Sequence, residues 1–125
     1  HKQNRFCVWE EEIVMEFRLS KKAVELLNNQ PLTKTKAIKN CISKVRTVSN
    51  AKILPPYIVD ELRKHIEEYK RSSERVRTKY SCVGDAEAQG TYDFAKLIAA
   101  TYRTSISSFV DFCIVRGLTE NEKKF

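Results

Sequence analysis

The side chains with the clearest chemical potential are basic and lie together in one stretch of the chain. Between Ser20 and Lys52 there are eight lysines and arginines but a single acid, Glu25, so this segment alone accounts for the net charge of +7. A concentrated positive field attracts polyanions such as nucleic acid, an acidic protein or an anionic membrane surface. A solvated helix face that keeps the protein soluble is the alternative interpretation.

Within this stretch, hydroxyl and basic side chains alternate at the start of an amphipathic segment. Thr33 or Thr35 can cap a helix whose apolar stripe runs from Ala37 to Val48. A helix N-terminus offers free N–H groups and a positive dipole end to a phosphate. The helical spacing also predicts that the basic residues here form one positive surface. The candidate nucleic-acid-binding residues of this segment are Thr33, Lys34, Thr35, Lys36, Lys39, Lys44 and Arg46.

Patterns for catalysis and metal binding are absent from the sequence. It has no glycine-rich phosphate loop, no serine nucleophile elbow and no Cys/His pair at zinc spacing. His65 lies in a helical pattern, which is typical of a surface or boundary histidine. The acids of Glu10–Glu12 are consecutive, so in an extended chain they point to alternating sides and cannot converge on one ion. We therefore expect no enzyme activity, no cofactor and no metal site.

The four cysteines, Cys7, Cys41, Cys82 and Cys113, are far apart in the sequence. Cys41 and Cys113 fall on the apolar faces of predicted helices, which favours free, buried thiols in a reducing compartment, either cytoplasmic or nuclear. There is no run of about 18 apolar residues, so we expect no membrane-spanning helix and no membrane partner.

A strand is predicted just before the basic segment. From Ile13 to Leu19, apolar and polar residues alternate, which is the pattern of a strand with one buried face. Ser20 then has the position of an N-cap, and the short helix that follows it should end near 28–29, ahead of Pro31.

Helical spacing dominates the second half of the chain. Pro55–Pro56 should start a helix about 20 residues long. Residues 76–83 fit either an extension of this helix or a second strand. Asp85 is a candidate cap for a fourth helix.

Thr104 or Ser105 is a candidate cap for a fifth helix, and Gly117 predicts where that helix ends. Segments 34–48 and 105–117 are both short helices behind a Ser/Thr start. This is a weak internal echo, of a kind that two amphipathic helices can show by chance.

The expected fold is mainly α, with four to five helices around one core and a short β-strand near the N-terminus. Residues 1–118 should form a single helical domain, in which 13–48 is a candidate strand–helix–helix DNA-binding unit and 55–118 is the helical bundle part. Residues 119–125 are expected to be a polar tail. If 76–83 is helical, the first strand should pair with its copy in a homodimer. If 76–83 is a strand, pairing within one chain should deprive Arg18 of a binding role.

Residues 13–48 resemble the ribbon-helix-helix family of DNA-binding proteins in their order of strand, Ser20-started helix, short turn and Thr33-started helix. The resemblance implies that two strands pair between protomers and place outward side chains in the major groove of DNA. It also implies that Val14, Glu16 and Arg18 read bases and that the start of the second helix, from Thr33 to Lys36, grips phosphate.

Two looser resemblances point in the same direction. The segment Thr101–Leu118 is similar to a helix in the core-binding domains of tyrosine recombinases, and the size and charge of the chain are similar to those of small RNA-binding subunits of ribonucleoprotein complexes. We therefore expect nucleic-acid binding, with duplex DNA ahead of RNA. The alternative is a helical protein–protein interaction domain that docks a protein partner in a larger assembly.

Overall fold

The computed structural model describes residues 14–123 and has the mainly helical fold expected from the sequence. In chain order its elements are β1 (Val14–Ser20), α2 (Lys21–Asn28), α3 (Lys34–Val48), α4 (Pro56–Arg71), β2 (Arg75–Ser81), α5 (Ala86–Thr101) and α6 (Ile106–Lys123). None of the helices in this part of the chain is long and apolar enough to cross a membrane. The expectations for Cys7, Glu10–Glu12 and Ile13 lie outside the described residues.

Side-chain caps fix where four of the helices begin, as the sequence predicted. Each capping oxygen accepts a hydrogen bond from an N–H group in the first turn, which would otherwise have no partner inside the helix. The capping residues and the N–H groups from which they accept are Ser20 with Ala23 at 3.2 Å, Thr33 with Lys36 at 3.3 Å, Asp85 with Ala88 at 3.0 Å and Ser105 with Ser108 at 3.1 Å.

β1 and β2 form a two-stranded antiparallel sheet within one chain. Of the two structures that residues 76–83 allowed, the strand is the one present. The pairing centres on Phe17 opposite Thr78, with matched pairs continuing on either side. We expected β1 to pair with a second protomer only if 76–83 were helical, and this condition is not met, because β1 has a partner in its own chain.

Two predicted helix ends are also wrong. α4 ends at Arg71 rather than continuing to Val76, because the chain turns there into β2. α6 runs through Gly117 to Lys123, so the stop at Gly117 is not observed, and residues 119–123 of the expected tail are helical. A Cβ at Gly117 would lie 3.1 Å from Cys41 Sγ. The glycine therefore serves close packing between α3 and α6 rather than helix termination.

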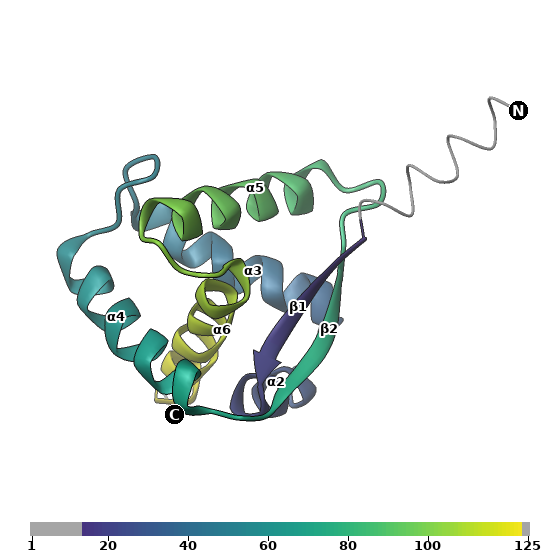
Figure 1. The fold of residues 1–125 in the computed structure, drawn as a ribbon. Coiled ribbons are helices and arrows are strands. Elements are labelled where there is room, and N and C mark those ends of the chain that lie inside the picture. Colours follow the sequence, from purple (N-terminus) through teal and green to yellow (C-terminus); the bar gives the residue numbers. More distant parts are fainter. Residues whose placement is uncertain (1–13, 124–125) are drawn as a thin grey trace, which may run out of the picture.

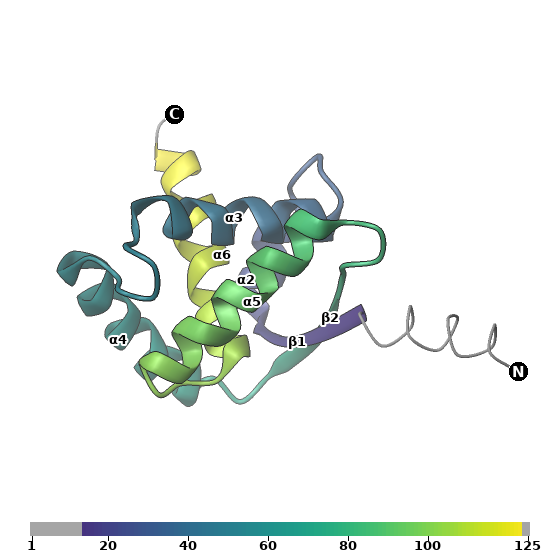
Figure 2. The same cartoon turned by 90° about the horizontal axis from the view of Figure 1, so that it is seen from above.

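The chain contains two strand–helix–helix segments of the same order, which we call the first half (β1–α2–α3) and the second half (β2–α5–α6). α6 packs on β1 and α2, α3 packs on β2 and α5, and α3 and α6 pack against each other. In both Figure 1 and Figure 2 the sheet lies on one side of this central helix pair and α4 on the other. These contacts and the strand register relate the two halves by an approximate twofold symmetry. The two segments that resemble each other in sequence, 34–48 and 105–117, lie in the equivalent helices α3 and α6.

The core lies between the sheet and the central helix pair. From the sheet, Phe17 and Tyr80 are completely buried, with ring centroids 5.5 Å apart. The fully or almost fully buried side chains of the central helices include Ile38, Cys41, Ile42, Val110, Cys113 and Ile114. Burial of each large apolar side chain contributes roughly 1.5–3 kcal/mol, so the packing of the two halves on each other holds the sheet in place.

Candidate nucleic-acid interface

The β1–β2 sheet has one buried and one exposed face, because side chains alternate along each strand. Phe17, Leu19 and Tyr80 point into the core, whereas the residues that alternate with them are exposed. We call the four exposed residues at the centre of the sheet the ribbon face; they are Glu16, Arg18, Arg77 and Lys79. The ribbon face therefore presents three basic side chains and one acidic one to solvent.

Charge on the ribbon face is not balanced pair by pair. Arg18 lies directly opposite Arg77, and like charges in that position destabilise a sheet. The diagonal ion pair between Arg77 Nε and Glu16 Oε1 spans 3.9 Å, and the two side chains are 68% and 46% exposed. Water screens both this ion pair and the repulsion between the two exposed arginines, so neither contributes much to stability. An anion over the ribbon face would offset the repulsion between the two arginines.

The starts of α3 and α6 lie along the two outer edges of the sheet. In the first turn of α3, Thr35 Oγ1 accepts a hydrogen bond from the Ser81 N–H of β2 at 3.3 Å. In the first turn of α6, Ser107 Oγ accepts one from the Arg18 N–H of β1 at 2.9 Å. Each helix start is thus tied to the strand of the other half. Two helix N-termini, which favour anions, flank the ribbon face.

At the α3 start, the predicted residues divide into two roles. Thr33 caps the helix, and the hydroxyl of Thr35 holds the edge of β2. Lys34 and Lys36 have exposed side chains. The two lysines therefore supply positive charge beside the ribbon face, whereas the two threonines position them.

At the α6 start, a surface cavity of about 370 Å³ is lined by basic and hydroxyl side chains, among them Lys70, Arg75, Arg103, Thr104, Ser105 and Ser108. Arg75 is engaged by the protein itself: its guanidinium lies 4.0 Å from the centre of the Tyr69 ring and donates to the backbone carbonyls of Tyr69 and Ser72. Arg75 therefore caps the C-terminal end of α4, whose last carbonyl groups would otherwise lack donors. Lys70 and Arg103 are exposed around the same cavity.

The remaining basic residues predicted on α3 do not share one surface. Lys39 Nζ lies 3.2 Å from both Asp85 Oδ2 and Glu87 Oε1, at the start of α5. The hydrogen bonds that Lys39 donates to these two carboxylates raise its pKa. Lys44 Nζ points the other way and donates to the Gly117 carbonyl of α6 at 3.4 Å. The predicted single positive surface is therefore not formed, because Lys39 contacts α5 whereas Lys44 contacts α6.

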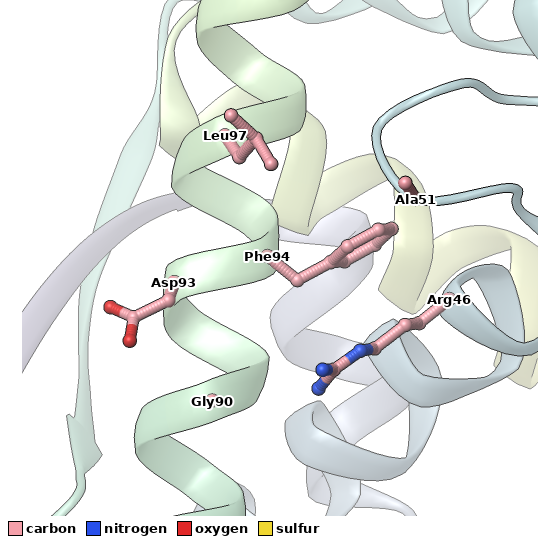
Figure 3. A pocket seen from close by; sticks show the side chains of 6 residues that line it. All are labelled: Arg46, Ala51, Gly90, Asp93, Phe94 and Leu97. Atoms are coloured by element: carbon pink, nitrogen blue, oxygen red, sulfur yellow. The ribbon is translucent and has the colours of Figure 1, made fainter.

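Arg46 lies in the last turn of α3, and its side chain extends toward α5 beside Gly90 and Phe94 (Figure 3). Its guanidinium lies 5.8 Å from the centre of the Phe94 ring of α5, a cation–π arrangement. It also lines a surface cavity of about 470 Å³ together with Asp93 and Leu97. Arg46 therefore connects α3 to α5 in this structure.

A buried polar junction that sequence reasoning missed lies where β1, α2, α4 and α6 meet. The side chain of Asp111 accepts hydrogen bonds from the Ser20 N–H at 2.6 Å and the Ser20 hydroxyl at 3.1 Å. His65 Nε2 lies 2.6 Å from Asp111 Oδ1. The serine hydroxyl donates to the carboxylate rather than to the imidazole, so the three residues do not form a nucleophile–base pair. Their contacts fix the junction between strand and helix.

The thiols and acids of the described residues offer no metal site. No group of three or more His, Cys, Asp and Glu side chains in residues 14–123 could hold an ion. Cys41, Cys82 and Cys113 are free and buried, as expected for two of them. Burial raises the pKa of Cys41 to about 11 and raises the pKa values of Cys82 and Cys113 as well. A high pKa suppresses the thiolate, which is the reactive form.

Arg77 and Lys79 are the ribbon-face residues that sequence reasoning missed. Charge summed over the whole chain outside Ser20–Lys52 cancels to zero, and that sum hid them. The available signal was the alternation of Arg77 and Lys79 with Val76, Thr78 and Tyr80, which is the pattern of a strand with one basic face.

No protein-family model matches this chain, and neither a curated protein nor a solved structure does.

Proposed function

We propose that this protein binds duplex DNA through the ribbon face, without catalysing a reaction on it. The observation that carries the proposal is the position of three exposed basic side chains on a two-stranded ribbon with a helix start along each edge. The major groove of B-DNA is about 12 Å wide and admits a two-stranded ribbon. The narrow major groove of A-form RNA does not, which favours duplex DNA over RNA.

The ribbon-helix-helix resemblance supports the same proposal in a modified form. In that family the paired strands come from two protomers, whereas here the two halves of one chain supply both strands. We propose that one chain is equivalent to the two-protomer unit and that a homodimer is not required for binding. Arg18 keeps its outward position on the ribbon, so the pairing of β1 with β2 does not remove it from a DNA-reading role.

Phosphate contacts are assigned in this proposal to the helix starts. Lys34 and Lys36 beside β2, and the hydroxyl groups at the α6 start beside β1, would meet the two DNA backbones that border the major groove. Lys39, Lys44 and Arg46 are engaged with α5 and α6 and contribute less. The buried thiols are consistent with a reducing compartment, cytoplasmic or nuclear, where DNA is available.

The proposal is tested by measuring binding to a random-sequence duplex at about 50 and 200 mM salt. The affinity should fall at least about tenfold between these concentrations, because bound lysines and arginines release counterions from DNA. The variant Arg77→Ala/Lys79→Ala should bind at least about tenfold more weakly at the lower salt concentration, since two basic side chains no longer release counterions from the DNA. The matched control is Arg63→Ala/Lys64→Ala on α4, which removes the same two charges at exposed positions away from the sheet.

Equal weakening by both double variants would show that net charge, rather than the ribbon face, attracts the DNA. Failure to bind the duplex even at low salt would favour the alternative, a protein-interaction domain. Some apolar side chains outside the ribbon face are about half exposed and would be candidates for that role: Val48, Ile53, Tyr57 and Leu97. Scattered apolar residues of this kind are common on protein surfaces, so the ribbon face remains the stronger candidate.

A further inference from the structure

The ribbon has twofold geometry but different side chains at equivalent positions. Phe17 and Thr78 face each other at the centre of the register. Counting outward from this pair, Glu16 of β1 is equivalent to Arg77 of β2, and Arg18 of β1 is equivalent to Lys79 of β2. One equivalent pair therefore differs in the sign of its charge, and the other differs in the shape of its cationic group.

Because equivalent positions differ, the two ends of the ribbon face differ as well. One end carries Arg18 opposite Arg77, and the other carries Glu16 opposite Lys79. Arginine forms two parallel hydrogen bonds with the O6 and N7 atoms of guanine, and lysine also donates to these atoms. Glutamate accepts from the N4 amino group of cytosine. The arginine end thus offers donors only, whereas the other end offers one acceptor and one donor.

A ribbon made from two identical strands presents the same groups at both ends and matches a DNA site with twofold symmetry. This ribbon does not. We infer that one chain reads an asymmetric, non-palindromic duplex site, with guanines in the half that lies under Arg18 and Arg77. The inference rests on the proposed function and adds to it the kind of sequence recognised.

The site is also expected to be occupied by one chain in one orientation. Reversing the protein on the DNA would move Glu16 onto the guanine-rich half. There the carboxylate would face guanine acceptors and would lack a donor. Glu16, which adds nothing to general attraction for an anionic duplex, thereby becomes the residue that fixes orientation.

The test is selection of binding sites from a library of random duplexes, using the unmodified full chain and two variants that make the ribbon ends equal. Glu16→Arg/Lys79→Arg places arginine at all four positions of the ribbon face. Arg18→Lys/Arg77→Glu places one lysine and one glutamate at each end. All four positions are exposed, and circular dichroism checks that each variant keeps its helix content.

The unmodified protein should enrich a site without twofold symmetry, and the two variants should enrich two different palindromes. Replacing the half under Glu16 and Lys79 with an inverted copy of the other half should weaken binding by the unmodified protein at least about tenfold. The same replacement should strengthen binding by Glu16→Arg/Lys79→Arg at least about tenfold, because both ends of that ribbon then face a guanine-containing half. Arg63→Ala/Lys64→Ala should enrich the same site as the unmodified protein.

The outcomes separate the two proposals. A palindrome enriched by the unmodified protein overturns the asymmetry while leaving DNA binding intact. If the unmodified protein retains DNA but enriches no sequence, the asymmetric site is likewise overturned and DNA binding is left intact. Failure to retain any duplex at low salt overturns both the asymmetry and the proposed function.

Discussion

The two halves of the chain make equivalent junctions with groups of opposite charge. In the first half, α2 begins at Ser20, and Asp111 of α6 binds this residue. In the second half, α5 begins at Asp85, and Lys39 of α3 binds this residue at 3.2 Å. Each central helix therefore holds the capping residue of the other half, with an anion in one case and a cation in the other.

The two junctions differ most in burial. The Asp111 side chain is 1% exposed, whereas that of Lys39 is 15% exposed and its partners Asp85 and Glu87 are 37% and 72% exposed. A buried carboxylate depends on its hydrogen-bond donors, since water cannot replace them. A partly exposed ion pair exchanges its contacts with water at little cost. The Asp111 junction is therefore expected to contribute much more to the free energy of unfolding than the Lys39 junction, although the two have the same geometry.

The largest effect is expected from Asp111→Ala. It leaves the Ser20 N–H, the Ser20 hydroxyl and His65 without their common partner in a buried site. Each donor that such a site leaves without an acceptor costs about 1–3 kcal/mol, and three donors are affected here. Chemical denaturation should show this loss of unfolding free energy, and thermal unfolding should shift downward by about 10 °C or more.

The matched control for this variant is Asp60→Ala, which removes an exposed aspartate from α4. It should change stability by less than about 0.5 kcal/mol. Equal losses in the two variants would contradict the special role of the buried junction.

Features of the fold that depend on residues close together in sequence could be predicted, whereas features that depend on tertiary contacts could not. Ser20, Thr33 and Asp85 were identifiable as caps because a cap depends on residues within one turn. Whether β2 is a strand or a helix could not be decided from the sequence, because alternation over seven residues competes with helical spacing. Its partner strand also lies about sixty positions away in sequence. Gly117 looked like a helix end because its true neighbour, Cys41, is a tertiary contact.

The same distinction applies to the candidate site. Thr33, Lys34 and Lys36 were found from their position at a helix start, and Arg18 from strand alternation. Lys39, Lys44 and Arg46 were placed on one surface because nothing local reveals that their neighbours lie on α5 and α6. Asp111 and Arg77 required the tertiary arrangement, since each acquires its role from a residue of the other half.

A smaller effect is expected from the glycines of the second half. Gly117→Val should lower the unfolding free energy by about 2 kcal/mol, because its Cβ would lie 3.1 Å from Cys41 Sγ and overpacking costs roughly 1–3 kcal/mol. In α5, a Cβ at Gly90 meets only Arg46 Nη1 at 3.6 Å. Gly90→Ala should therefore raise stability by about 0.5–1 kcal/mol through helix propensity.

Adding Cys41→Ala to Gly117→Val checks the cause of the loss. The double variant should be more stable than the sum of the two single losses, because removal of the sulfur makes room for the new side chain. Strict additivity would mean that the close contact between α3 and α6 is not the source of the effect.

The smallest effect is expected at the exposed junction, where Lys39→Ala should cost less than about 1 kcal/mol at neutral pH. Its signature is a dependence on pH. The Ala88 N–H and Lys39 lower the pKa of Asp85 below its ordinary value of 3.8. A carboxyl group with a lowered folded-state pKa stabilises the protein above about pH 4, and this contribution is lost as the pH falls through the folded-state value. Asp85→Asn keeps a capping side chain but cannot titrate.

Urea unfolding at about pH 6 and pH 2.5 compares the acid sensitivity of the two junctions. Between these values Asp85→Asn should lose less stability than the unmodified protein, and Lys39→Ala should lie between the two because the Ala88 hydrogen bond remains. Asp60→Asn removes a carboxyl group from an exposed position on α4 and should follow the unmodified protein. If Asp85→Asn and Asp60→Asn respond to acid in the same way, the Lys39–Asp85 contact does not distinguish the second junction, and the acid response must arise from carboxyl groups elsewhere in the chain.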